Sequence, residues 1–243
     1  MVELTDRQIK ILKTIIDEYI ETAEPVGSQT LDKKYSLGVS PATIRNEMVR
    51  LTQNGFLKQP HTSAGRVPTP MALKFYIQNL MQKKEMSVSD EVSVKEKIWD
   101  YRLKRERLLR EAVKALAEKT HTLAIATTSE NEVYYAGMAN LLDMLEFYDM
   151  IMTKNLLTVL DQFGFWGDIF NRDAQEAPFH VIFGEELKHE YLNNCGMVYT
   201  VIATPKLACA IGIVGPNRLN FPRVIPVVTY FHQILTEISN SWR

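Results

Sequence analysis

One segment of the chain is bounded at both ends by residues that fix where a helix begins and ends. Ser40 can cap a helix with its hydroxyl, and Pro41 suits the first helical position, where its missing N–H costs nothing. Asn54 and Gly55 are typical of a helix end. Three apolar residues recur on one face between these signals: Ile44, Met48 and Leu51. The sequence therefore predicts a half-buried helix over residues 40–53.

Two further helical patterns precede this segment. Thr5 and Gln8 form a capping-box pair at the start of an apolar pattern with helical spacing. Ser28 is expected to cap a second helix that runs to about Ser36. Gly38 can then take the left-handed backbone angle of a tight connection to the third helix. The order is three short helices with close connections.

A polar hairpin follows the third helix. Residues 56–59 are strand-like, the stretch QPHTSAGRVPT covers residues 59–69, and Arg66 and Val67 begin the return. Three helices and a hairpin in this order are typical of a winged helix-turn-helix domain, which we expect over residues 1–84. Such a domain can also serve protein contacts alone, and the pattern does not separate the two uses.

The third helix and the hairpin supply the candidate DNA contacts. An α-helix fits the major groove of B-DNA, where arginine pairs with guanine and asparagine with adenine. Gly65 is expected to allow a sharp turn or the close approach of a ligand, and Arg66 to meet a phosphate or enter a minor groove. The candidate DNA-binding residues are Ser40, Ala42, Thr43, Arg45, Asn46, Arg50, His61, Ser63, Gly65 and Arg66.

The charge of the chain is unevenly distributed. The net charge is −1, but residues 1–110 carry 19 Lys and Arg against 14 Asp and Glu, whereas residues 111–243 carry 9 against 15. A basic front half and an acidic back half favour different partners for the two halves. The excess permits nucleic-acid binding without establishing it.

The remainder of the chain is expected to form a connection and a second domain. Residues 85–120 read as a linker up to about residue 93 and then a charged connecting helix over 94–119, with an apolar stripe narrow enough to pair with a second copy. Residues 121–243 mix strand and helix patterns, which predicts an α+β domain with a largely antiparallel sheet. The expected helices include 141–148 and 153–170.

Membrane, metal and cofactor signals are weak. No apolar run approaches the ~20 residues that span a bilayer, and the first residues lack a signal-peptide pattern, so a cytoplasmic location is expected. Cys195 and Cys209 lie in apolar, strand-like sequence without metal-ligand spacing and are interpreted as buried free thiols. We expect no cofactor and no bound metal.

Several runs of the sequence resemble the heat-inducible transcription repressor family, HrcA. In the front half these are EPVGS-x-TL, ATIRNEM and QPHTSAGR-x-PT; in the back half they include Asn140-Leu141-Leu142, residues 183–186 and GIVGPNRLNFP. The resemblance covers roughly residues 4–80 and 134–240. It implies a homodimeric repressor that binds an inverted-repeat operator ahead of chaperone genes, a GAF-like back half, and regulation by the chaperonin GroEL. Heat stress diverts the chaperonin, and repression is then lost.

The chain departs from the family pattern in length. Members of the family are about 100 residues longer and carry a domain inserted into the GAF-like part, which contributes to dimerisation. Most of the material expected between the connecting helix and VYYAGMANLL is missing here. The usual dimer surface is therefore in question, and the helix over 94–119 is one candidate to replace it.

Two other classes of function are open to the sequence. A small-molecule-responsive regulator would use the GAF-like domain to hold a ligand, although four aromatics there read as core: Tyr134, Tyr135, Phe179 and Tyr199. An enzyme would need a reactive cluster, and the only pattern is Glu186-x-x-His189 with Glu185 and Glu190, as metal ligands on one helical turn. That spacing alone is a weak signal, and no phosphate-binding loop or nucleophile motif accompanies it.

Overall fold

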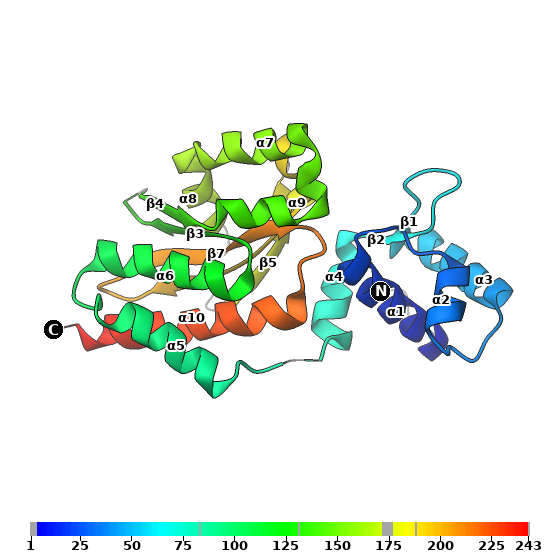
Figure 1. The fold of residues 1–243 in the computed structure, drawn as a ribbon, viewed down its shortest axis with the longest axis horizontal. Helices are drawn as coiled ribbons and strands as arrows, with labels where there is room; N and C mark the ends of the chain where they lie inside the picture. The colour runs from blue at the N-terminus through cyan, green and yellow to red at the C-terminus, as the bar shows by residue number, and fades with distance from the viewer. Residues whose placement is uncertain (1–3, 83, 131, 172–176, 188, 243) are drawn as a thin grey trace. The chain divides into compact units, whose positions relative to one another are not determined.

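A computed structural model describes residues 4–82, 84–130, 132–171, 177–187 and 189–242 of the chain. The chain divides into two compact units, Met1–Gln82 and Lys83–Arg243. Figure 1 shows the first in blue and cyan and the second in green to red. Within the described residues, no helix has both the length and the apolar character that crossing a membrane requires.

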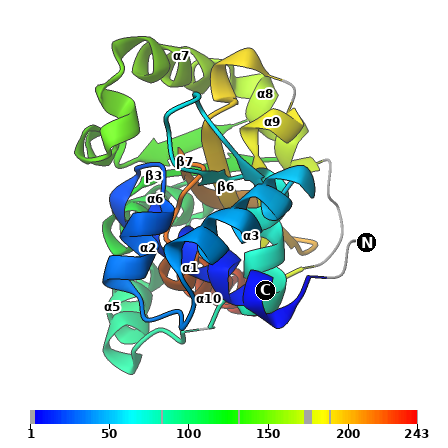
Figure 2. The same ribbon diagram turned by 90° about the vertical axis from the view of Figure 1, so that its right-hand side faces the viewer.

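The first unit is helical with one small hairpin. Its elements are α1 (Asp6–Thr22), α2 (Ser28–Lys34), α3 (Pro41–Gln53), β1 (Leu57–Lys58), β2 (Val67–Pro68), α4 (Pro70–Phe75) and the π-helix η1 (Tyr76–Leu80). Helices α1, α2 and α3 pack together, as Figures 1 and 2 show from two sides. β1 and β2 pair antiparallel, with Leu57 opposite Pro68. The three helices and the hairpin follow the order that the sequence predicts.

Local capping sets the helix starts. The capping box of Thr5 and Gln8 is present, and the Ser40 hydroxyl accepts a hydrogen bond from the Thr43 amide at the start of α3. The prediction that Ser28 caps α2 is wrong. Gly27 is the cap residue, Ser28 is already helical, and α2 ends at Lys34. The Ser28 hydroxyl therefore does not satisfy the first amides of α2 as a capping side chain would.

The core of the first unit comes from the apolar faces of its helices. These side chains are almost fully buried: Ile11, Leu12, Ile15, Ile16, Leu31, Ile44, Met48, Leu51, Leu73 and Tyr76. The predicted face of α3 is thus the buried one. Its opposite face is left for other contacts.

The second unit is built on a five-stranded antiparallel sheet. Its strands are β3 (Leu123–Thr128), β4 (Val133–Ala136), β5 (His180–Phe183), β6 (Cys195–Ala203) and β7 (Ala208–Pro216), in the order β4-β3-β7-β6-β5. Its helices are α5 (Val88–Trp99), α6 (Arg105–Thr120), α7 (Met150–Leu160), α8 (Phe163–Asn171), α9 (Gly184–Leu187) and α10 (Phe221–Ser241). Three 3-10 helices complete it: η2 (Met138–Asp143), η3 (Leu145–Tyr148) and η4 (Glu190–Leu192). The chain is therefore an α+β protein, as predicted.

Helices cover both faces of this sheet. α6 and α10 pack on one face with α5 outside them, and α7 and α8 lie over the other (Figure 1). Alternate strand residues reach the two layers, so Leu123, Ile125 and Tyr199 join the cluster under α7 and α8. Cys195 and Cys209 are buried free thiols, as predicted. Burial raises the pKa of each thiol to about 12, which keeps both protonated and unreactive at neutral pH.

The prediction of one continuous connecting helix over residues 94–119 is wrong. The structure has two helices, α5 and α6, separated by residues 100–104, and α5 already begins at Val88. Both belong to the second unit. The apolar stripe expected to pair with a second copy consists of Leu103, Leu109, Val113 and Leu116. Leu103 is exposed between the two helices, whereas Leu109, Val113 and Leu116 are buried inside that unit. The part of the stripe on α6 is therefore not free for dimerisation, because the sheet and α10 occupy it.

Two other helix predictions are also wrong. Residues 141–148 form parts of the 3-10 helices η2 and η3 rather than one α-helix. Residues 153–170 are divided between α7 and α8, which are separated at residues 161–162. Of the four aromatics read as core, Tyr199 is fully buried, Tyr134 and Phe179 are half-buried, and Tyr135 is exposed.

Candidate nucleic-acid interface

The outward face of α3 carries most of the candidate DNA-binding residues. Ser40, Ala42, Arg45, Asn46 and Arg50 are exposed, and Thr43 is half-buried beside the Ser40 hydroxyl, 3.0 Å between the oxygens. They are exposed because the helical period that buries Ile44, Met48 and Leu51 turns the intervening positions outward. Exposed polar side chains on one helical face can meet the edges of bases.

The two arginines of α3 are held differently. Arg50 donates to the carboxylate of Glu47 at 3.4 Å, and that buried carboxylate also accepts from the Gln8 amide at 3.1 Å. The side chain of Arg45 makes no hydrogen bond or ion pair within the described residues. Its guanidinium keeps all of its donors available, whereas Arg50 is partly committed to the protein.

Internal hydrogen bonds shape the hairpin loop, residues 59–66. The Gln59 side-chain amide donates to the carbonyls of Thr62 and Ala64 at 2.8 and 3.0 Å. Ser63 and the His61 ring share a contact of 3.3 Å, and the Ala64 amide donates to the His61 carbonyl. His61, Thr62 and Ser63 are exposed at the tip, which projects from the unit in Figure 1. The loop is therefore a defined turn.

Gly65 serves a purpose that the sequence prediction missed. Its close approach is to the protein's own backbone: a Cβ at this position would lie 2.5 Å from the carbonyl carbon and oxygen of Val26. Next to it, Val26 and Arg66 exchange two backbone hydrogen bonds of 2.9 Å as an isolated antiparallel bridge. Gly65 thus lets the base of the hairpin loop join the segment between α1 and α2.

Arg66 is fixed by a second contact. Its Nε donates to the hydroxyl of Thr52, near the end of α3, at 3.2 Å. The side chain therefore links the hairpin to α3 and is half-buried. Because Nε is one of five guanidinium donors, the terminal nitrogens remain available to an anion. Thr52 was not a candidate on sequence grounds, and no local pattern singles it out.

A groove of about 500 Å³ brings the two parts of the candidate site together. It contains Arg45 of α3 and Ser63, Gly65 and Arg66 of the hairpin loop. The start of α2 contributes residues 27–30, which sequence reasoning left out although they follow the run EPVGS. Six candidates lie outside the groove: Ser40, Ala42, Thr43, Asn46, Arg50 and His61. The groove is bordered by two basic side chains and has no acidic residue in its lining.

A polar cluster orients α2 against α1. The buried carboxylate of Glu18 accepts hydrogen bonds from Lys34 Nζ at 2.7 Å and from the Tyr35 hydroxyl at 2.6 Å. The bond from Lys34, followed by that from Tyr35, lowers the pKa of Glu18, while burial raises the pKa of Tyr35 to about 12. No local sequence pattern predicts this cluster, because Lys34 and Tyr35 lie 16 and 17 positions from Glu18.

We predict that Glu18→Gln destabilises the first unit by about 1–3 kcal/mol at neutral pH, since it replaces the buried carboxylate that accepts from Lys34 and Tyr35 with a neutral amide. The folded pKa of Glu18 lies below its ordinary value near 4.5. Its contribution is therefore complete above pH 4.5 and is lost as the pH falls through the folded pKa. Amide hydrogen exchange of α1 and α2 against pH measures both effects.

Glu21→Gln is the matched control for Glu18→Gln. Glu21 also contacts Lys34, at 3.2 Å, but its side chain is mostly exposed. Exposed ion pairs contribute little, so exchange in α1 and α2 is expected to change much less. Equal protection in the Glu18→Gln and Glu21→Gln variants would contradict the role of Glu18.

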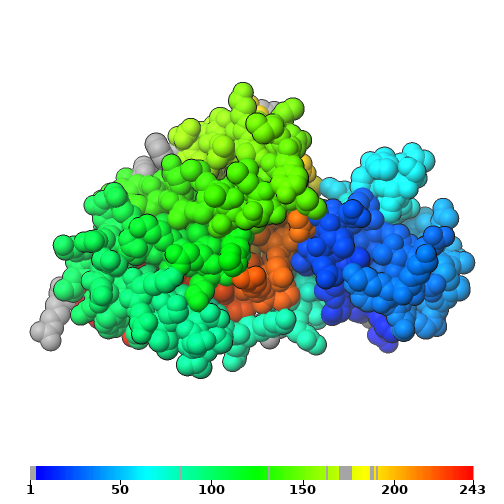
Figure 3. All heavy atoms as spheres, in the orientation of Figure 1, coloured from blue at the N-terminus to red at the C-terminus, as the bar shows by residue number. Residues whose placement is uncertain are grey.

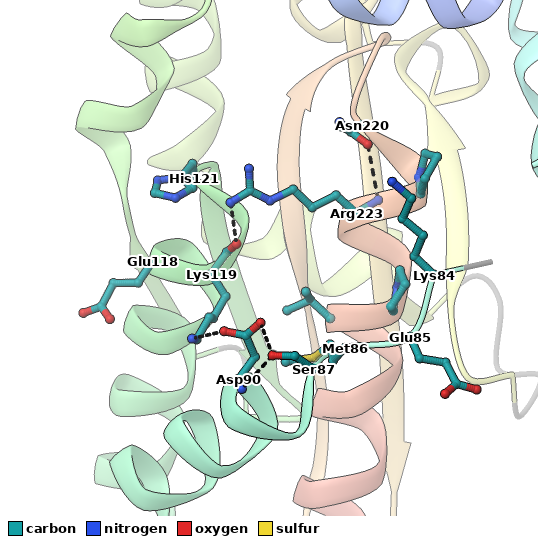
Figure 4. A pocket seen from close by; sticks show the side chains of 13 residues that line it. Lys84, Glu85, Met86, Ser87, Asp90, Glu118, Lys119, His121, Asn220 and Arg223 are labelled. Atoms are coloured by element: carbon teal, nitrogen blue, oxygen red, sulfur yellow. Dashed lines mark hydrogen bonds and ion pairs between the residues drawn. The ribbon is translucent and has the colours of Figure 1, made fainter. Parts of the chain in front are cut away.

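The second unit has a separate polar cavity of about 490 Å³ (Figure 4). Arg223 extends across it toward the carbonyl of Lys119, while Asp90 accepts from Lys119 at 2.7 Å and from Ser87 at 2.8 Å. The contacts with Lys119 and then Ser87 lower the pKa of Asp90. Much of the cavity's charge is thus paired internally, unlike the apolar lining typical of small-molecule sites.

The Glu186-x-x-His189 pattern, which an enzyme would use as metal ligands on one helical turn, is not formed. α9 ends at Leu187, so Glu186 and His189 do not share one helical turn, and the Glu186 carboxylate accepts from the Phe183 amide at 3.0 Å. The His189 ring packs against Phe165 and Tyr191. In the described part of the chain, no three His, Cys, Asp or Glu residues are grouped to hold a metal ion.

Similar proteins agree on one kind of function. A relative from Carboxydothermus hydrogenoformans is 43% identical over 336 aligned positions, which cover 97% of this chain and 98% of the relative. Another, from Pelotomaculum thermopropionicum, is 27% identical over 341 positions and covers 97% of both chains. Both are named heat-inducible transcription repressors. By class, the protein is a transcriptional repressor.

The family follows from a second match. The model described as "HrcA protein C terminal domain" matches residues 71–225. The chain belongs to the HrcA family. Its fold is also similar to a crystal structure described only as a hypothetical protein, with a TM-score of 0.76, 19% identity, and coverage of 98% of this chain and 99% of the other.

The alignments also show that the difference in length between this chain and its relatives is internal. The 341 aligned positions of the Pelotomaculum thermopropionicum relative exceed the 243 residues of this chain by 98. Because 97% of each chain is covered, most of these extra positions fall inside the alignment. The relative therefore carries internal material that this chain lacks.

Proposed function

We propose that the first unit is a winged helix-turn-helix domain that binds double-stranded DNA. In this arrangement α3 is the recognition helix in the major groove, and the hairpin loop is the wing. The observation that carries the proposal is the groove that contains Arg45 of α3 and Arg66 of the loop. A base-reading side chain and a phosphate-binding side chain are thereby held on one surface.

The contacts divide by chemistry. Arg45 and Asn46 are exposed and suit the edges of guanine and adenine. The amides at the start of α3, near Ser40 and Ala42, suit a phosphate, helped by the helix dipole. The terminal nitrogens of Arg66 also suit phosphate, because Thr52 fixes the side chain through Nε alone.

Charge placement matters more than net charge for this proposal. Of the 19 basic residues in the front half, ten lie in residues 1–82, against eight acidic ones. The first unit is therefore only slightly basic. Binding rests on where the arginines lie, and it should weaken as salt rises because phosphate neutralisation releases counterions.

At the level of the whole chain, we propose a homodimer on an inverted-repeat operator ahead of chaperone genes. Two-fold symmetry in the protein is mirrored by half-sites one helical turn, or a multiple of it, apart. The second unit is then a GAF-like regulatory domain, and release on heat stress follows from loss of support by the chaperonin GroEL. The names of the relatives support the heat-inducible part of this proposal.

Arg45→Ala is expected to relax sequence preference at one base pair of the operator and to cost about 1–3 kcal/mol there. The reason is that a bidentate contact to a base edge is lost while the phosphate contacts remain. Competition binding with operator variants measures the preference. Lys10→Ala, which removes an exposed cation of α1 outside the groove, is the control. An equal loss on all sequences would assign Arg45 to the DNA backbone instead.

Selection of bound sites from random duplex DNA tests the proposal as a whole. An inverted repeat among the selected sequences supports sequence-specific, dimeric recognition. Failure to enrich any sequence, with full-length folded protein, would leave the first unit as a protein-contact domain.

A small-molecule-responsive regulator is the alternative. The polar cavity of the second unit is the place where it would be tested. A metabolite that raises the melting temperature of the second unit and changes operator affinity would favour this alternative.

A further inference from the structure

The second unit exposes an unusual concentration of apolar side chains. Of the thirteen exposed large apolar residues in the described part of the chain, seven fall within residues 138–157. We call these the apolar surface: Met138, Leu142, Leu145, Tyr148, Met150, Ile151 and Leu157. They come from η2, η3 and α7, which pack against one another. Exposed apolar patches of this kind mark interaction sites.

The apolar surface is held rigid from beneath. Arg218 binds the Glu146 carboxylate with both Nε and Nη2, at 2.5 and 2.9 Å. The Thr153 hydroxyl donates to the Phe147 carbonyl at 2.6 Å, and Asp149 caps α7 through the Ile151 amide at 2.8 Å. These bonds fix the backbone that displays the apolar side chains. A partner can therefore bind without first ordering this region, which lowers the entropic cost of association.

We propose that the apolar surface is the interface between two copies of this chain. The inference rests on the proposed function, because a two-fold operator requires two copies. The apolar surface also provides the dimer contact that α6 cannot provide, since the apolar stripe of that helix is buried inside the second unit.

Area and charge both favour a second copy as the occupant. The seven side chains are 40% to 79% exposed, and at about 200 Å² each when fully exposed they offer roughly 800 Å², the share of one partner in a standard interface. Asp143 and Lys154 lie within the same stretch, residues 138–157, and both side chains are exposed. A symmetric pairing brings both signs of charge to the rim of the same interface. In Figure 3 the green to lime atoms of residues 138–157 contribute to the visible face of the second unit.

Ile151→Asp on the full chain tests the interface. The side chain is 71% exposed, so the change leaves the fold intact but places a carboxylate where apolar contact is required. Leu103→Asp is the matched control, because Leu103 is 80% exposed and lies between α5 and α6, outside the apolar surface. Tryptophan fluorescence checks folding, since Trp99, Trp166 and Trp242 all belong to the second unit.

Sedimentation over about a hundredfold range of concentration gives the first result. The wild-type chain and Leu103→Asp are expected at twice the monomer mass of 27.9 kDa. Ile151→Asp is expected to weaken association by at least about tenfold. A wild-type monomer throughout, or an Ile151→Asp variant that associates as well as Leu103→Asp, overturns the inference. In the latter case the surface has another occupant.

DNA binding separates this inference from the proposed function. Ile151→Asp should match wild type on a single half-site and lose the gain in affinity that a second half-site gives. Retention of that gain overturns the interface. If no form of the chain binds DNA, yet Ile151→Asp alone is monomeric, the proposed function fails and the interface stands.

Discussion

Gly65→Ala is expected to lower operator affinity by roughly ten- to hundredfold, the equivalent of about 1–3 kcal/mol. The added Cβ would lie 2.5 Å from the Val26 carbonyl and 2.8 Å from the carbonyl carbon of Pro25, so one backbone segment must move. That movement opens the bridge between Val26 and Arg66 and displaces the arginine from the groove. The three helices are expected to remain folded, because their core does not include this loop.

Operator affinity measured over a range of salt concentrations tests this prediction for Gly65→Ala. If Arg66 no longer meets phosphate, the slope of log affinity against log salt should fall by about one per lost contact. Gly164→Ala in α8 of the second unit is the control, since Gly164 lies outside the groove and its Cβ would meet nothing within 4 Å. Equal affinities of the two variants would show that the position of the hairpin loop does not matter for binding.

Gly212→Ala is expected to destabilise the second unit by about 2–4 kcal/mol, which lowers its melting temperature by roughly 5–15 °C. Gly212 lies in β7 opposite Tyr199 of β6 and Ile125 of β3. A Cβ there would lie 2.3 Å from the Tyr199 Cβ and 2.5 Å from the Val198 carbonyl oxygen. Because both neighbours belong to β6, an interior strand of the sheet, neither can move without breaking sheet hydrogen bonds.

Tryptophan fluorescence follows this unfolding, since all three tryptophans lie in the second unit. Gly164→Ala in α8 is the control, and it is expected to stabilise the second unit rather than destabilise it. Its Cβ would meet nothing within 4 Å, and alanine in a helix is favoured over glycine by about 1 kcal/mol. An unchanged melting temperature in Gly212→Ala would contradict the tight packing of β6 against β7.

Particular residues show which features local sequence can predict. Ser40 and Pro41 begin α3, and Asn54 and Gly55 end it, because each acts on the backbone within a few positions. The apolar period of α3 correctly places Arg45 and its neighbours on the exposed face. The antiparallel sheet predicted for the second domain is also present, since β-branched, apolar runs favour extended backbone.

The same reasoning fails where a residue's role depends on a distant partner. Gly65 looked like a residue for ligand approach, but its neighbour is Val26, 39 positions earlier. Arg66 is held by Thr52, and Glu18 by Lys34 and Tyr35, with no local pattern that pairs them. The break between α5 and α6 was missed because residues 100–104 carry neither glycine nor proline.

The sequence by itself thus determined the order of elements in the first unit, the α+β character of the second, and the candidate DNA-reading face of α3. These depend on caps, turns and hydrophobic periods, which act over a few residues. Only the tertiary structure decided that the apolar face of α6 is buried and that seven apolar side chains within residues 138–157 are left exposed. Burial is decided by which elements pack together, and that depends on contacts between residues far apart in the chain.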